Sequence, residues 1–257
     1  MQHIKITRPS LDYYSLEALK SLRTNLLFCG EEKKVIVFTS CSQNEGKTYC
    51  MLNLGIALSE IGKKVLIIDA DLRKSVLLGR VDVTGSVKGL SHFLSRQCVA
   101  REILYETGIP NFHIVFAGYM PPNPAELLSN KYFEYLINTM RNHYDYILID
   151  SPPLGSVIDS AVIAPQCDGT IIVIESGWNS WRFVQDIKEQ IERTGIPILG
   201  VILNKMEITT SKYYGKYGRY GRYGRYGRYG RYGQDNTQPV SNVSEIELEE
   251  LIIDEGK

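Results

Sequence analysis

The segment Val35-Ile-Val-Phe-Thr-Ser-Cys-Ser-Gln-Asn-Glu-Gly46-Lys47-Thr48 joins a run of β-branched residues to the start of a helical pattern. A loop that leads from a strand into a helix directs several backbone N–H groups to one point, where the helix dipole also favours an anion. Gly46 lets the backbone approach phosphate closely, Lys47 is expected to reach the β- and γ-phosphates, and the Thr48 hydroxyl is expected to bind Mg²⁺. The segment therefore predicts a P-loop that binds ATP and Mg²⁺ through Ser42, Gln43, Asn44, Glu45, Gly46, Lys47, Thr48 and Tyr49.

The loop departs from the usual pattern G-x-x-x-x-G-K-[ST] at its first position, where this chain has Cys41. A chance Gly-Lys-Thr is the alternative interpretation. The strand before the motif, the helical pattern after it and two acidic strand ends elsewhere favour a true P-loop.

Aspartates close two other apolar runs. Asp69 and Asp71 follow Val65-Leu-Ile-Ile, and Asp150 follows Tyr146-Ile-Leu-Ile. Alternate side chains of an extended chain share a face, so Asp69 and Asp71 are both expected at the carboxyl edge of the sheet, where ligands of open α/β sheets bind. We expect Thr48, Asp69 and Asp150 to hold the metal. Each aspartate alone has a second interpretation, as a polar residue that ends a strand.

The order of segments predicts an α/β fold: a mostly parallel, doubly wound sheet flanked by helices, as in P-loop NTPases. The apolar runs are continuous rather than alternating, which suits strands covered on both faces. Strands are expected at residues 35–39, 65–69, 112–116, 146–150, 170–174 and 198–203. Helices are expected at about residues 15–28, 47–61, 125–143, 159–165 and 180–193.

Composition narrows the class of protein. The chain has 257 residues, and its 29 Lys and Arg balance its 29 Asp and Glu, so net charge indicates neither nucleic acid nor an acidic substrate as a partner. Its five cysteines show no metal-binding or disulfide spacing, which fits a reducing cytoplasm. No apolar run reaches the roughly 20 residues that span a bilayer, so we expect any membrane recruitment to depend on another protein.

The pattern changes after about residue 208. Residues 212–233 repeat a basic residue, Tyr and Gly, and such a segment offers almost nothing apolar to bury, so residues 209–233 are predicted to be a disordered tail. Residues 234–257 form an acidic segment in which a short helix is expected around 245–253. We divide the chain into an N-terminal segment (1–30), a P-loop core (31–208), the tail and the acidic segment. The candidate phosphate acceptors in the tail are Tyr213, Tyr214, Tyr217, Tyr220, Tyr223, Tyr226, Tyr229 and Tyr232.

Together these motifs resemble the bacterial tyrosine kinases of capsule and exopolysaccharide synthesis, the cytoplasmic CpsD/CapB-type proteins. The loop 39–48 is similar to their Walker A motif, Asp69-Ala-Asp71-Leu-Arg73 to their D-x-D-x-R motif, and 147–153 to their Walker B motif. Residues 121–128 are similar to the family's P-P-N-P-x-E-L-L segment, and 17–25 to its E-x-x-R-x-x-R-T-N helix. The likeness runs from about residue 12 to 204, and the tyrosine-rich tail follows it.

The resemblance implies roles for individual residues. Lys47, Asp69, Asp71 and Arg73 are expected to be catalytic, with Asp69 or Asp71 accepting the phenol proton, and Asn204 is expected to contact adenine. For Arg73, binding phosphate and pairing with a nearby acid both remain open. Glu17, Lys20 and Arg23 are expected to mediate ring-like self-association, although Lys20 replaces an arginine and so lacks the guanidinium fork. Asn44 stands where the family usually has glycine, and asparagine tolerates left-handed backbone geometry.

The resemblance also implies partners: further copies of the chain, a separate Wzz-like transmembrane activator that recruits the protein to the inner face of the plasma membrane, and a tyrosine phosphatase. Two alternatives remain open. The core could be an ATP-gated assembly or partition-type ATPase, although Ser42 stands where that group carries a signature lysine. The Arg-Tyr-Gly tail could bind nucleic acid, which we consider less favoured because a kinase core supplies a use for the phenols.

Overall fold

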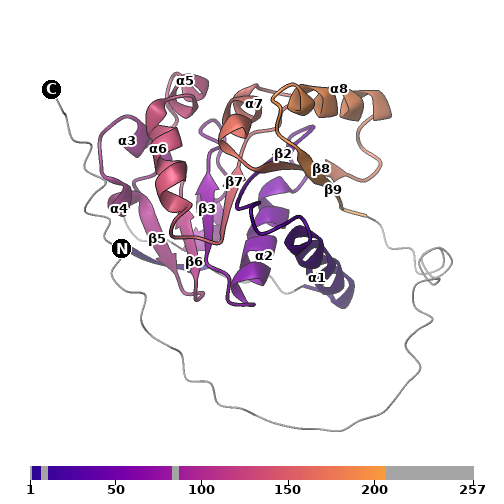
Figure 1. Ribbon diagram of the computed structural model, residues 1–257, viewed down its shortest axis with the longest axis horizontal. Coiled ribbons are helices and arrows are strands. Elements are labelled where there is room, and N and C mark those ends of the chain that lie inside the picture. The colour runs from indigo at the N-terminus through magenta and orange to yellow at the C-terminus, as the bar shows by residue number, and fades with distance from the viewer. Residues whose placement is uncertain (1, 7–10, 83–86, 207–257) are drawn as a thin grey trace, which may run out of the picture.

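The computed structural model describes residues 2–6, 11–82 and 87–206. The predicted tail, its eight tyrosines and the acidic segment lie outside these residues. Within them the chain forms one sheet with helices on both faces (Figure 1). The strands are β1 (Gln2–Ile6), β2 (Val35–Ser40), β3 (Val65–Asp69), β4 (Val81–Asp82), β5 (Leu104–Thr107), β6 (Phe112–Val115), β7 (Tyr146–Asp150), β8 (Gly169–Glu175) and β9 (Ile198–Asn204). The helices are α1 (Tyr13–Leu27), α2 (Lys47–Ser59), α3 (Leu90–Leu94), α4 (Ala100–Ile103), α5 (Pro124–Leu128), α6 (Lys131–Met140), α7 (Asp159–Ile163) and α8 (Trp181–Glu192), with 3₁₀ turns at Leu78–Arg80 and Ala164–Gln166.

The strand order of the described sheet is β4-β1-β5-β6-β3-β7-β2-β8-β9. Six neighbouring strands of this order are parallel, as predicted: β6, β3, β7, β2, β8 and β9. The prediction missed β1, β4 and β5, and with them the antiparallel pairs β5–β6 and β1–β4. Polar residues interrupt the apolar ones in all three strands, whose sequences are QHIKI, VD and LYET, so none shows the continuous apolar run of a central strand.

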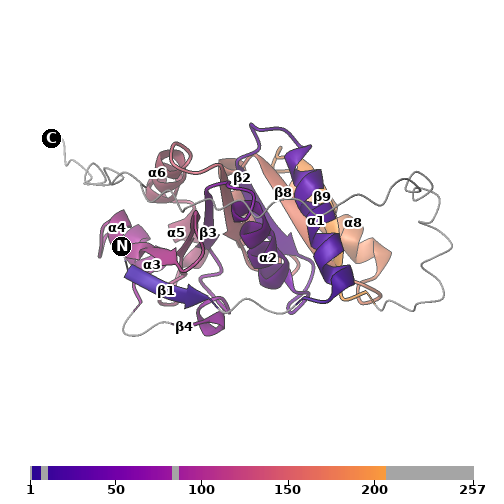
Figure 2. The ribbon, with the colours of Figure 1, turned by 90° about the horizontal axis from the view of Figure 1, so that it is seen from below.

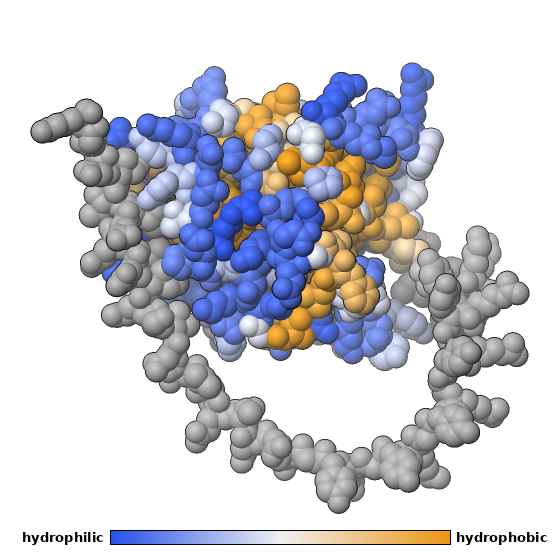
Figure 3. All heavy atoms as spheres, in the orientation of Figure 1, coloured by the Kyte–Doolittle hydropathy of each residue, from blue (hydrophilic) through white to orange (hydrophobic). Residues whose placement is uncertain are grey.

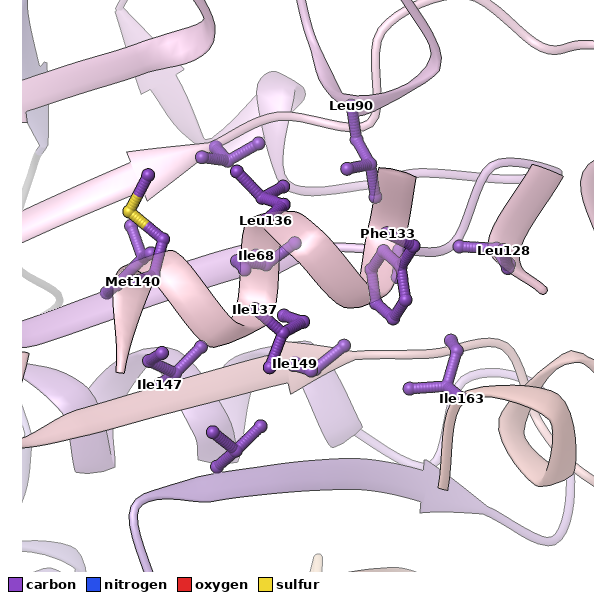
Figure 4. Close-up of a cluster of buried hydrophobic side chains, with 14 of the residues drawn as sticks. Ile68, Leu90, Leu128, Phe133, Leu136, Ile137, Met140, Ile147, Ile149 and Ile163 are labelled. Atoms are coloured by element: carbon purple, nitrogen blue, oxygen red, sulfur yellow. The ribbon is translucent and has the colours of Figure 1, made fainter. Parts of the chain in front are cut away.

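Alternate residues of the central strands face two separate cores, which explains the continuous apolar runs. In β2 and β3, Val37 and Ile68 pack with residues of α3 to α7, whereas Phe38 and Ile67 pack with residues of α1 and α2. Figure 4 shows Ile68 close to Leu136 and Ile137 of α6. Figures 1 and 2 show these helices on opposite sides of the sheet. A third, smaller cluster joins α8 to β8 and includes Cys41. The buried sheet is therefore a rigid platform for the loops at its carboxyl edge.

The helix predicted over residues 125–143 is two helices. α5 ends at Leu128, and the side chain of Asn130 accepts a hydrogen bond from the Tyr132 backbone N–H (3.2 Å) to cap the start of α6. Asparagine side chains compete with helical backbone bonds and favour such caps. The break lets α6 turn its apolar side, which includes Phe133 and Ile137, onto the sheet.

β9 is one end strand of the described sheet, since it pairs with β8 alone. Val201 and Leu203 on this strand are more than half exposed. In Figure 3 apolar atoms gather on the surface in the region of β9 and its neighbours. Exposed apolar patches of this kind often mark interaction surfaces. Among the described residues, no helix has the length and apolar character needed to cross a membrane.

Candidate functional site

The P-loop of this chain is shaped by two left-handed residues. Asn44 has φ 64° and Gly46 has φ 87°, which confirms that asparagine can serve at position 44. A Cβ on Gly46 would overlap the side-chain nitrogen of Asn204, so glycine is required there for space as well as for geometry. Cys41 has no left-handed backbone, and its side chain is buried in the α8 cluster. The loop therefore has no need of the glycine that is usual at this position.

Glu45 stabilises the loop from behind. Its buried carboxylate accepts hydrogen bonds from the backbone N–H of Ser42 (2.7 Å) and of Glu175 (3.1 Å) and from the side-chain amide of Asn179. The amide of Asn204 donates to the Glu45 carbonyl oxygen (2.8 Å). These bonds tie the loop to the ends of β8 and β9. The sequence placed Glu45 and Asn204 among the nucleotide contacts, and both line the cavity described below.

Lys47, Thr48 and Asp150 converge at the start of α2. The Lys47 ammonium forms a buried ion pair with one oxygen of Asp150, and the Thr48 hydroxyl donates to the other oxygen (2.6 Å). Parallel pairing sets Asp150 directly beside Asp69, because β3 and β7 are in register at these two residues. All four residues are at most 7% exposed. The predicted convergence of Asp69 and Asp150 on the P-loop is therefore present.

Asp69 lies beneath this group and is fully buried. Its carboxylate accepts hydrogen bonds from the Ser75 hydroxyl and from the Asp71 backbone N–H (3.2 Å). Burial, followed by repulsion from Asp150, raises the pKa of Asp69 to about 8. The one buried cation beside the two carboxylates, Lys47, pairs with Asp150, and such an excess of buried negative charge is typical of a functional site.

Replacing Asp69 with asparagine is expected to stabilise the nucleotide-free protein. The pKa of Asp69 is about 8 in the folded chain and near its model value of 3.8 in the unfolded chain. The folded state therefore binds the proton more tightly, and the wild type loses stability relative to Asp69→Asn as pH rises from about 4 to about 8. Thermal melts at pH 5 and pH 8 should show the melting-temperature gain widening by about 7 to 15 °C, because each pH unit between the two pKa values is worth about 1.4 kcal/mol. A gain that is the same at both pH values would contradict the buried, uncompensated carboxylate.

Asp71 and Arg73 lie closer to the surface than Asp69. One oxygen of Asp71 accepts hydrogen bonds from the backbone N–H groups of Arg73 (3.3 Å) and Lys74 (2.9 Å). Its second oxygen has no hydrogen-bond partner among the described residues. Arg73 makes a bidentate ion pair with Asp159 (2.8 and 2.9 Å). Of the two roles that the sequence left open for Arg73, pairing with a nearby acid is the one seen in the nucleotide-free protein.

A cavity of about 530 Å³ opens above these residues, a size that suits a nucleotide. It is lined by Ser40, Gln43, Asn44, Glu45, Gly46, Lys47, Thr48, Tyr49, Asp71, Arg73, Lys74, Val76, Pro152, Pro153, Ser156, Val157, Asn204 and Lys205. The cavity thus gathers most of the residues that the sequence assigned to ATP. Ser42, Asp69 and Asp150 are not among the lining residues.

The donor set fits Mg²⁺ that arrives with a nucleotide. Among the described residues, no three or more His, Cys, Asp or Glu side chains are arranged to hold a metal by themselves. Mg²⁺ commonly takes one or two carboxylates and completes its shell with phosphate oxygens and water. Thr48 lines the cavity and its hydroxyl donates to Asp150, which does not line the cavity, while Asp69 stands beside Asp150 in the sheet.

Comparison with known proteins identifies the family. A family model described as an AAA domain matches residues 33–196. The chain is 42% identical over 205 residues to the tyrosine-protein kinase CpsD of Streptococcus agalactiae, a match that covers 78% of this chain and 90% of that protein. This chain belongs to the bacterial tyrosine-protein kinase family. The kinase domain of the Escherichia coli tyrosine kinase ETK has a TM-score of 0.72 to it at 27% identity, covering 86% of this chain and 80% of that one. The chimerical protein CapA2B2 has a TM-score of 0.71 at 29% identity, covering 79% and 93%. The P-loop fold of the family implies ATP binding.

A network that sequence reasoning missed joins the three nucleotide motifs of the kinase. The Ser160 hydroxyl donates to the Pro152 carbonyl (2.6 Å) and lies within hydrogen-bond distance of the hydroxyls of Thr39 (2.9 Å) and Ser151 (2.8 Å). Its neighbour Asp159 holds Arg73. The start of α7 therefore connects the P-loop strand, the D-x-D-x-R turn and the Walker B loop. An aspartate and a serine at a predicted helix start, nine residues after Asp150, were the available signal.

Replacing Asp159 with asparagine is expected to lower both stability and the phosphorylation rate, because Arg73 loses its ionic anchor. The loss of stability should be about 1 kcal/mol, since Arg73 is partly exposed to solvent. Asp168 is a matched control: it pairs with Arg141 (2.7 Å) and accepts bonds from Lys34 and Val35 at the opposite edge of the sheet. Asp168→Asn should lower the stability of the kinase, measured by urea titration. It should leave the phosphorylation rate per folded molecule unchanged. Equal rates for the two variants would remove Asp159 from the site.

The predicted self-association residues lie on α1. Glu17 and Lys20 are exposed and pair with each other (2.7 Å), while Arg23 donates to the Ala57 carbonyl near the end of α2 (3.1 Å). Arg23 thus connects α1 to α2 of the same chain. The role of the three residues in assembly stays a prediction.

Proposed function

We propose that this chain is a protein-tyrosine kinase that uses Mg-ATP to phosphorylate the tyrosine cluster in its own C-terminal tail, in trans, and so regulates capsule or exopolysaccharide synthesis and export. The observation that carries the proposal is that Lys47, Thr48 and Asp71 line one nucleotide-sized cavity, and that Asp150 contacts both Lys47 and Thr48. The same chain carries eight tyrosines between residues 213 and 232. Family membership supplies the reaction type.

The nucleotide is expected to enter with its base near Asn204 and its phosphates over the P-loop. Lys47 then exchanges Asp150 for the β- and γ-phosphates, and the carboxylate it releases is free to face the metal. Thr48, Asp150 and the neighbouring Asp69 would hold Mg²⁺, which would supply positive charge that favours transfer. The buried ion pair therefore keeps both side chains ordered and near their working positions before ATP binds.

Asp71 is the best candidate for the group that accepts the phenol proton. It lines the cavity and has one oxygen without a hydrogen-bond partner among the described residues, whereas Asp69 is fully buried and bonded to Ser75. A tyrosine phenol has a pKa near 10, so a carboxylate placed at its hydroxyl assists attack. We assign this role to Asp71 and a metal-facing role to Asp69.

Phosphorylation would reverse the charge of the tail. Residues 212–232 hold seven basic residues, no acid and all eight tail tyrosines, and each phosphate adds about −1.5 to −2. Eight phosphates would move the segment from +7 to roughly −5 to −9. We propose that this change loosens a homo-oligomer formed through α1, to which the exposed apolar patch on β9 contributes. We propose further that a separate transmembrane activator brings the kinase to the inner membrane face and that a phosphatase reverses the modification.

Mass mapping of the full-length protein tests this function. After incubation with Mg-ATP and a cytoplasmic fragment of the activator, phosphate should appear on tail tyrosines, and EDTA should prevent it. The rival function, an ATP-gated assembly or partition-type ATPase, predicts release of inorganic phosphate while the tyrosines stay bare. A bare tail in the active, ATP-consuming wild type would reject the kinase proposal.

A further inference from the structure

The only two tryptophans of the chain, Trp178 and Trp181, lie at the surface where β8 leads into α8. They are 70% and 75% exposed, although tryptophan is on average a highly buried residue. Among the described residues, neither indole has a ring contact or a cation–π contact. The two side chains, which we call the tryptophan pair, are therefore open to a partner outside the described residues.

Polar contacts fix the loop that carries the tryptophan pair. Asn179, which lies between the two tryptophans, donates to the Glu45 carboxylate and accepts from the Ser42 hydroxyl (3.1 Å). The Ser180 side chain caps the start of α8 by accepting from the Phe183 backbone N–H (3.3 Å). The indoles are thus presented on an ordered backbone, so a partner has less conformational entropy to overcome when it binds them.

The tail begins beside this loop. The Ser176 backbone N–H donates to the Asn204 carbonyl at the end of β9 (2.9 Å), and Trp178 follows Ser176 by two residues. Met206 is the last residue that the structure describes, and the first basic residue of the repeats, Lys212, comes six residues later. Six residues reach about 20 Å when extended. The repeats can therefore reach the tryptophan pair of their own chain.

The composition of the tail matches two exposed indoles. Residues 212–233 hold seven basic residues and eight tyrosines, with five consecutive Arg-Tyr-Gly units. Tryptophan is the best ring partner for a guanidinium group, and tyrosine and tryptophan rings also attract one another. Residues 234–257 have seven acids, one lysine and no aromatic residue. The chemistry thus favours the repeats over the acidic segment as the occupant.

We propose that the tryptophan pair is a docking site for the Arg-Tyr-Gly repeats of the same chain, whose guanidinium groups stack on the indoles. Weak contacts suffice, because a short tether gives the repeats a millimolar effective concentration. A phosphate on a repeat tyrosine adds about −1.5 to −2 charge and competes for the arginines, so phosphorylation releases the tail. This release rests on the proposed kinase function, whereas the docking itself does not.

Acrylamide quenching of fluorescence tests the docking in the full-length protein without a label, because both tryptophans belong to the pair. The test variant replaces all five repeat arginines with glutamine: Arg219→Gln, Arg222→Gln, Arg225→Gln, Arg228→Gln and Arg231→Gln. Its quenching constant should be about twofold above that of the wild type, since a stacked group shields one face of an indole. The control, Glu245→Gln with Glu247→Gln and Glu249→Gln, should keep the wild-type constant.

Trypsin gives a second measurement, because it cleaves after the repeat arginines and its rate follows the population of undocked tail. The variant with Trp178→Ala and Trp181→Ala should lose its tail about fivefold faster than the wild type, as expected for the loss of ring contacts at exposed sites. Both positions are at the surface, so the fold should persist. Phe28→Ala, at an 83% exposed aromatic residue that ends α1, is the control and should leave the rate unchanged.

Equal quenching in the wild type and the arginine variant, or equal cleavage in the wild type and the tryptophan variant, would overturn the proposal. So would protection that rises with protein concentration, which would make a second copy the occupant, or protection that depends on the three glutamates. Mg-ATP should raise the quenching constant as phosphate appears on the tail, whereas a non-hydrolysable analogue should not. Tail tyrosines that stay bare would reject the kinase function and leave the docking result in place.

Discussion

Replacement of Lys47 with methionine is expected to reduce phosphate transfer to tyrosine by on the order of 10³-fold or more, because no other described cation is buried beside Thr48 and Asp150. The ammonium neutralises charge on the transferring phosphoryl group, and methionine fills the same space without charge. The rate of incorporation of labelled phosphate from ATP measures the effect.

The fold should survive Lys47→Met. Asp150 keeps the hydrogen bond from Thr48 (2.6 Å), and a buried carboxylate that loses its counter-charge takes up a proton rather than unfolding the chain. Lys188→Met removes a surface lysine that pairs with Glu192 and serves as the control. Transfer by Lys47→Met within tenfold of the wild type would remove Lys47 from its role.

Asp71→Asn is expected to lower kcat by about 10²- to 10⁴-fold, the usual contribution of a positioned general base, with little change in the KM for ATP. The amide keeps an oxygen that can accept the backbone hydrogen bonds of Arg73 and Lys74, so the turn should persist. Initial rates at saturating acceptor, over a range of ATP concentrations, separate the two constants.

Asp69→Asn provides the comparison for this variant. Asp69 faces Ser75 and Asp150 rather than the cavity, so its loss should weaken metal-dependent activity and be relieved in part by higher Mg²⁺. Asp71→Asn should not respond to Mg²⁺. If Asp71→Asn is nearly as active as the wild type and Asp69→Asn is inactive at all Mg²⁺ concentrations, the proton acceptor is Asp69.

The sequence was informative where one physical requirement dominates a segment. Strands buried on both faces need continuous apolar runs, so the parallel centre of the sheet was predicted and confirmed, as was its P-loop NTPase class. The left-handed geometry at Asn44 was likewise predictable, because few residue types tolerate it. Residues 104–107 and 2–6 gave no comparable signal, since short strands near the far edge depend on pairing with neighbours that are distant in sequence.

Local sequence patterns did not predict which distant segments contact one another. Glu45 was assigned to nucleotide binding from its place in the loop, yet its carboxylate is directed to Glu175 and Asn179, 130 or more residues away. The pairing of Arg73 with Asp159 was one of two open possibilities, because the sequence gave no means to locate the acid. A smaller cavity beside the nucleotide cavity depends on the meeting of the turns after β3 and β6, which no local pattern encodes.

Transfer between two distinguishable chains is the most direct test of the central claim, that the Lys47–Asp150 site moves phosphate from ATP to tail tyrosines of another copy. One chain keeps the wild-type core and has its eight tail tyrosines changed to phenylalanine; the other carries Lys47→Met and an intact tail. We predict that, with labelled Mg-ATP and the activator fragment, the mixture labels the tail of the Lys47→Met chain, whereas neither chain is labelled alone. An unlabelled mixture, under conditions in which the wild type labels itself, would contradict transfer in trans, and labelling of the Lys47→Met chain alone would contradict the site.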